Sequence, residues 1–113
     1  MMNVICSANF KSEVLDYDGI VVVDYFTQWC SKCKQLMPFI EKLSNEFPDI
    51  KFVKVDCTNI SDVVKELFTD NGIEHGAIRG LPHVDVIKNG KIEEIKGAVT
   101  PAIISKTIEE MRG

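Results

Sequence analysis

The sequence has few cysteines, no long apolar run and no excess of positive charge, and each shortage argues against a class of protein. Four cysteines in 113 residues are fewer than a small secreted domain uses for a disulfide framework. The apolar runs are far shorter than the roughly 20 residues that a membrane-spanning helix needs. Residues 1–10 have neither a basic start nor an apolar core, so we expect no secretory signal and a cytoplasmic protein.

Charge and length set further bounds. Thirteen basic against seventeen acidic residues give a net charge of −4, and no basic stripe is present that would attract nucleic acid. A content of 45% hydrophobic and 27% charged residues is ordinary for a soluble globular protein. The length suits one hydrophobic core and not two. We therefore expect residues 1–113 to form one domain, a monomer that binds neither nucleic acid nor membrane.

The spacing of apolar residues predicts alternating strands and helices. Strands are expected at 3–6, 20–26, 51–56, 83–88 and 91–96. A first helix is expected after a Ser7 cap, with Phe10, Val14 and Leu15 on one face. Two more are expected at 31–47 and from Asn59 or Ser61 through Phe68. The last is expected at 101–111, with Ile103, Ile104 and Ile108 facing inward. Asn89-Gly90 favours a tight hairpin. This order predicts an α/β fold: a central mixed five-stranded sheet, parallel in its first half and ending in an antiparallel hairpin, flanked by four helices.

Cys30 and Cys33 are separated by two residues where a predicted strand gives way to a predicted helix. The free N–H groups and positive dipole of a helix N-terminus favour a thiolate, so we expect an exposed Cys30 sulfur with a lowered pKa. Cys33, one turn further on, should be more buried. Such a pair can exchange with a disulfide, with Cys30 as nucleophile and Cys33 as resolving thiol. The alternatives are an inert pair or a metal-binding pair.

Two neighbours of the pair are also candidates. Asp24 interrupts an apolar strand six residues before Cys30. Burial raises the pKa of a carboxyl group, and an acid near Cys33 could accept its proton; the alternative is a surface acid. Trp29, in the turn before Cys30, would shield the sulfur and contact substrate, the alternative being a core tryptophan.

Several short motifs occur in one order along nearly the whole chain: Val23-Asp24-Tyr25-Phe26, Trp29-Cys30-x-x-Cys33-Lys34, Pro38, Lys54-Val55-Asp56, Ile78-Arg79-Gly80-Leu81-Pro82, Lys88-Asn89-Gly90 and Gly97. In these motifs the chain resembles the thioredoxin family. The resemblance implies a thioredoxin fold and a protein disulfide oxidoreductase that acts on disulfide-containing client proteins, receives electrons from an upstream reductase and needs no bound cofactor. No Gly-x-Gly-x-x-Gly fingerprint is present for taking hydride directly.

The resemblance also implies roles for single residues. Asp24 matches the buried acid of the family, and Lys54 matches a lysine that often pairs with it; the alternative for Lys54 is a solvent-facing side chain. Pro82 would have a cis bond to Leu81. The Leu81 backbone would then receive a substrate peptide as a short added strand.

This chain departs from the family pattern in three places. Ser31-Lys32 replaces the usual Gly-Pro, and we expect the Lys32 cation to stabilise the dithiol form and make the pair more oxidising. His83 replaces the usual Thr, either as a pH-dependent charge near the site or as a polar residue at a strand start. The chain also has extra residues between Asp56 and Pro82, expected around Thr69–Gly76.

The remaining candidates leave other functions open. Cys6 and Cys57 read as small buried apolar residues, with a regulatory thiol as the alternative for Cys57. His75 is expected to be solvated. One alternative function is a thioredoxin-fold binding module, in which Cys30 and Cys33 hold a metal or the loop at 70–80 binds a partner. Another is a disulfide oxidant or isomerase in an exported compartment.

Overall fold

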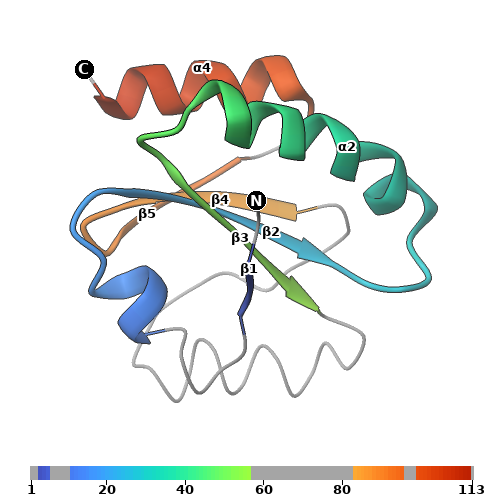
Figure 1. Ribbon diagram of the computed structural model, residues 1–113, viewed down its shortest axis with the longest axis horizontal. Helices are drawn as coiled ribbons and strands as arrows, with labels where there is room; N and C mark the ends of the chain where they lie inside the picture. Colours follow the sequence, from blue (N-terminus) through green and yellow to red (C-terminus); the bar gives the residue numbers. More distant parts are fainter. Residues whose placement is uncertain (1–2, 6–10, 57–82, 96–98, 113) are drawn as a thin grey trace.

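The computed structural model describes residues 3–5, 11–56, 83–95 and 99–112. Its elements, in chain order, are β1 (Asn3–Ile5), η1 (Lys11–Leu15), β2 (Ile20–Phe26), α2 (Ser31–Glu46), β3 (Lys51–Asp56), β4 (His83–Lys88), β5 (Lys91–Glu94) and α4 (Pro101–Arg112) (Figure 1). Outside the described residues lie the helix expected through Phe68, the loop at 70–80, Cys6, Cys57, His75, Leu81 and Pro82. None of the described helices is long and apolar enough to cross a membrane.

The strands form one mixed sheet in the order β1-β3-β2-β4-β5. The pairs β1/β3 and β2/β3 are parallel, whereas β2/β4 and β4/β5 are antiparallel. The parallel first half and the antiparallel C-terminal hairpin are both as predicted. β2 is therefore central, and the segment that follows it emerges from the middle of the sheet.

The sheet is covered on both faces, which explains why β2 is an almost continuous apolar run. Helices α2 and α4 lie over one face, and η1 lies on the other side (Figure 1). Alternate β2 residues, Ile20 and Val22, join the core under α2 and α4. Asp24 continues this series and so points to the α2 side, whereas Val23 and Tyr25 point to the opposite face.

The predicted hairpin is confirmed at Asn89-Gly90. Both residues have positive φ, 50° for Asn89 and 83° for Gly90, as a two-residue turn of this type requires. Asn89 also ties the turn to the start of β2: its side-chain oxygen accepts a hydrogen bond from the Gly19 N–H at 2.9 Å, and its own N–H donates to the Gly19 carbonyl at 3.1 Å. The strand after the turn ends at Glu94 and not, as predicted, at residue 96.

One prediction about a helix face was wrong. Ile103 is 37% exposed, whereas Ile104 and Ile108 are fully buried. Residues four apart share a helix face but adjacent residues are separated by about 100°, so Ile103 cannot follow its neighbour inward. In the first predicted helix, the described part is a single π-helical turn, Lys11–Leu15. In this turn Val14 is deeply buried and Leu15 is partly buried.

Candidate active site

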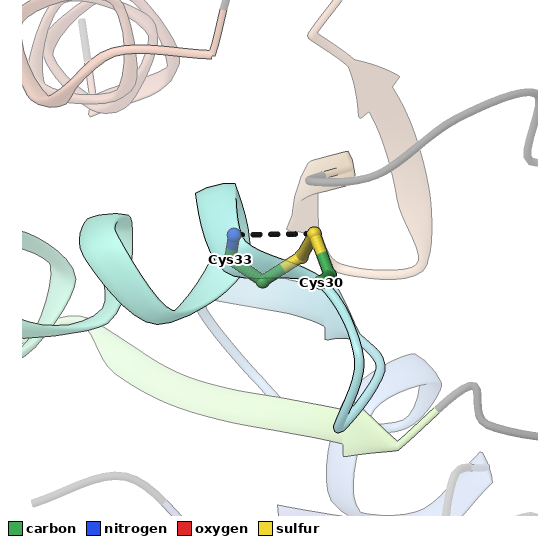
Figure 2. Close-up of a disulfide and its surroundings, with 2 residues drawn as sticks. All are labelled: Cys30 and Cys33. Atoms are coloured by element: carbon green, nitrogen blue, oxygen red, sulfur yellow. Dashed lines mark hydrogen bonds between the residues drawn. A yellow bond between two sulfur atoms is a disulfide. The ribbon is translucent and has the colours of Figure 1, made fainter.

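Cys30 and Cys33 are joined by a disulfide at the start of α2, with their Cα atoms 5.2 Å apart. Cys30 is the N-cap residue, and its backbone is extended. Its sulfur accepts a hydrogen bond from the Cys33 N–H at 3.2 Å (Figure 2). Cys30 is half-buried, whereas Cys33 is only 2% exposed. The more exposed residue of the pair is thus the one whose sulfur accepts an N–H of the helix start, where negative charge is favoured.

Asp24 is buried on the α2 side of the central strand, with 1% of its surface exposed. Neither carboxylate oxygen has a hydrogen-bond partner among the described residues. Burial raises the pKa of Asp24 to about 7, although the positive charge of Lys54 acts to lower it. Such a group exchanges its proton close to neutral pH.

Lys54 lies directly across from Asp24 in the register of β2 and β3. The sequence left two alternatives for Lys54, a pairing with Asp24 or a side chain that faces solvent. The side chain is half-buried and so lies between the two. Lys54 acts on Asp24 through its charge, but it does not hydrogen-bond to the carboxylate. The positive charge of Lys54 therefore stabilises the Asp24 carboxylate without a hydrogen bond to it.

The residues around the pair are mostly open to solvent. Trp29 is 78% exposed, which excludes the alternative of a core tryptophan. Ser31 and Lys32 are also exposed, in a first turn of α2 that contains no acidic residue. The exposed surface around the disulfide therefore combines an aromatic ring, that of Trp29, with the positive charge of Lys32.

His83 lies on the face of the sheet opposite to Asp24. It is paired across the strands with Tyr25, and the two ring centroids are 5.3 Å apart. His83 is 7% exposed, and its Nε2 lies 3.1 Å from Oδ1 of Asp85. The side chain predicted to be near the active site is thus held by a buried carboxyl on the other side of the sheet.

Asp85, which is fully buried, was not predicted from the sequence as a residue of interest. A signal was available, because Asp85 follows His83 by two residues in an otherwise apolar strand. Residues at this spacing share a face of the sheet. Phe26 and Met37 line an open pocket beside Cys33 and were not predicted as site residues either. As apolar residues at core spacing, they carry no signal of a surface role.

A metal site would need further ligands beside the two cysteines. Among residues 3–5, 11–56, 83–95 and 99–112, no group of three or more His, Cys, Asp or Glu side chains is arranged to hold a metal ion. What the described geometry supports is chemistry between sulfur atoms.

A cysteine pair that closes a disulfide at a helix N-terminus, with a buried acid on the same side of the central strand as that helix, is typical of a thiol–disulfide oxidoreductase. The family model for thioredoxin matches residues 1–110. The chain is 38% identical to thioredoxin-1 of Schizosaccharomyces pombe, covering 91% of this chain and 90% of the relative. It is also 38% identical to thioredoxin of Rickettsia prowazekii, covering 85% and 84%. The chain belongs to the thioredoxin family.

Solved structures agree with this assignment. The solution structure of oxidised thioredoxin from Plasmodium falciparum is similar over the full length of both chains, with a TM-score of 0.74 and 27% identity. Thioredoxin f from spinach chloroplast gives a TM-score of 0.79 and 31% identity, covering 99% of this chain and 87% of that one. The protein is accordingly an oxidoreductase for dithiol–disulfide exchange.

Proposed function

We propose that this protein reduces disulfides of client proteins, with Cys30 as the nucleophile and Cys33 as the resolving thiol. The observation that carries the assignment of roles is the difference in burial between the two sulfur-bearing residues. Cys30 is half-buried and caps α2, whereas Cys33 is 2% exposed. A client sulfur can approach the first but not the second.

The proposed reaction has two exchange steps. The Cys30 thiolate attacks one sulfur of the client disulfide, the client S–S bond breaks, and one client thiolate leaves. The Cys33 thiol then loses its proton and attacks Cys30 in the mixed disulfide, which releases the second client thiolate. Two electrons pass from the protein dithiol to the client, and the Cys30–Cys33 disulfide remains. An upstream disulfide reductase supplies the electrons that restore the dithiol.

Asp24 is the proposed proton acceptor for Cys33, directly or through water. Its pKa of about 7 suits a group that takes up a proton and gives it back at neutral pH. Its buried carboxylate has no described hydrogen-bond partner that would stabilise the charge permanently. Lys54 moderates this pKa from the neighbouring strand.

The other predicted site residues have supporting roles in this proposal. Trp29 contacts the client, and the backbone at Leu81, before a cis bond to Pro82, pairs with it as an added strand. Ser31 and Lys32 set the redox potential of the pair. His83 acts on the site indirectly, because it follows Pro82 in the chain and its side chain is held by Asp85.

We further propose one domain over residues 1–113, with a fourth helix between Asn59 or Ser61 and Phe68. The protein would act as a cytoplasmic monomer without a bound cofactor. The mixed sheet, the acidic net charge and the two helices over one face support a small independent carrier of this kind.

The test is the reduction potential of the Cys30/Cys33 pair, measured by alkylation and mass spectrometry in graded dithiol buffers. A value near about −270 mV is expected for a reductant of protein disulfides. A value between about −180 and −120 mV would assign the protein to oxidation or isomerisation instead. A pair that never forms a disulfide in solution would contradict both.

A further inference from the structure

An open pocket of about 740 Å³ adjoins the disulfide on the side of α2. One wall is the end of β2 with the segment that follows it, and includes Phe26 and Trp29. The other wall is the face of α2 that carries Met37 and Pro38. Cys33 also lines the pocket, so this space lies beside the sulfur pair.

The lining of the pocket is mainly apolar although the pocket is open to solvent. Trp29 is 78% exposed and Met37 is partly buried. Met37 also packs against the core, so the exposed apolar surface here is mainly that of Trp29 beside it. Concave apolar surfaces of this kind commonly receive a ligand side chain. The volume is ample for one large aliphatic or aromatic side chain.

The charges around the pocket are asymmetric. Lys34 lies at the end of the pocket next to Cys33, and Glu41 lies two turns further along α2. Lys32 adds a second exposed cation in the first turn, where the dipole of α2 is also positive. The disulfide end of the pocket therefore favours a carboxylate, and the far end disfavours one.

From this arrangement, we infer that the pocket selects clients whose disulfide is flanked by a large apolar side chain and an acidic residue. The apolar side chain would enter between Phe26 and Met37, and the carboxylate would face Lys34 at the disulfide end of the pocket. The inference rests on the proposed reduction of client disulfides, and it specifies which clients are preferred.

The test compares four matched peptides, each with one disulfide and with Phe or Ala and Asp or Lys at the two flanking positions. The protein is reduced with dithiothreitol and desalted, and single-turnover rates are measured without a reductase. Each rate is divided by the rate of the same protein with 2-hydroxyethyl disulfide, which has no side chains to bind. We expect the Phe peptides to react about 10- to 100-fold faster than the Ala peptides. We expect Asp over Lys to add about 2- to 5-fold, decreasing with salt.

Matched variants locate the effect in the pocket. Met37→Ala should reduce the preference for Phe, whereas Phe39→Ala should not, because Phe39 is on the same helix and 55% exposed but does not line the pocket. Lys34→Glu should reverse the preference for Asp, whereas Lys42→Glu, an exposed change on α2 away from the pocket, should not.

The outcomes separate this inference from the proposed function. Equal normalised rates for all four peptides, or equal losses in Met37→Ala and Phe39→Ala, would overturn the inference while leaving disulfide reduction intact. Failure to reduce 2-hydroxyethyl disulfide would instead overturn the proposed function, and the inference with it.

Discussion

His83 and Asp85 form a buried polar pair on one face of the central sheet, with Nε2 of the imidazole 3.1 Å from Oδ1 of the carboxyl group. With its proton on Nε2, the imidazole donates to the carboxylate. The His83 ring contacts the Tyr25 ring, and His83 directly follows Pro82 in the chain. The pair therefore orders the start of β4, immediately after the segment proposed to receive the client.

Loss of one member of this pair should destabilise the protein. Asp85→Val removes a carboxyl that the buried imidazole bonds to, and we expect the free energy of unfolding to fall by about 2 to 4 kcal/mol. Urea unfolding of the oxidised protein measures this change. The double variant His83→Val, Asp85→Val should recover much of the loss, since paired apolar side chains can replace a buried polar pair. Additive losses in the double-mutant cycle would contradict the proposed coupling.

Asp24 should make the stability of the fold depend on pH. Its pKa is 3.8 when unfolded and about 7 when folded, so the folded state holds the proton more tightly. The contribution of Asp24 to the free energy of unfolding is therefore greatest below about pH 4 and decreases as the pH rises towards 7. Above that pH it stays constant, about 4 kcal/mol lower.

Asp24→Asn removes this dependence. We expect the stability difference between Asp24→Asn and the parent to rise by about 4 kcal/mol in favour of the variant between about pH 3.5 and pH 8. Denaturant unfolding across this range, on the oxidised proteins, gives the result. A difference that does not change with pH would show that the carboxyl titrates normally. As a control, Lys54→Met should strengthen the dependence, because the lysine lowers this pKa.

The two cysteines should fail in different ways when replaced singly. Cys30→Ser removes the nucleophile, so client reduction should be lost and no adduct should form. Cys33→Ser keeps the nucleophile but removes the resolving thiol, so a client should remain attached to Cys30 as a mixed disulfide. Intact mass and peptide mapping after incubation with a peptide disulfide distinguish the two results. An adduct on Cys33 in the Cys30→Ser variant would reverse the assigned roles.

Lys32 should raise the redox potential of the pair. Its exposed cation in the first turn of α2 stabilises a thiolate and hence the dithiol form. Lys32→Pro should make the potential more reducing by about 10 to 20 mV, and proline is tolerated so near a helix start. Lys32→Met removes the charge without adding the proline ring, so it separates the effect of the charge on the potential from that of the ring. Lys42→Met, further along the helix, should leave the potential unchanged. An unchanged potential in Lys32→Pro would remove this role.

Local patterns predicted much of the fold. The alternation along β3, the apolar run of β2 and the Asn89-Gly90 turn each depend on residues close together in the chain, and each is found where expected. The predictions were wrong where burial depends on the position of one residue around the helix axis, as at Ile103. They were also wrong where an element ends, as at the end of β5. These depend on which neighbours the element meets in the folded protein.

The sequence by itself determined the chemistry of this protein. Two cysteines at a strand–helix junction share a helix turn whatever else surrounds them, because their separation of three residues is set by local backbone geometry. The tertiary structure alone decided the environments. Whether Asp24 finds a partner, which face His83 occupies and whether Phe26 and Met37 line one pocket depend on how the strands and helices pack. Burial and electrostatic fields arise from those long-range contacts, so no local pattern encodes them.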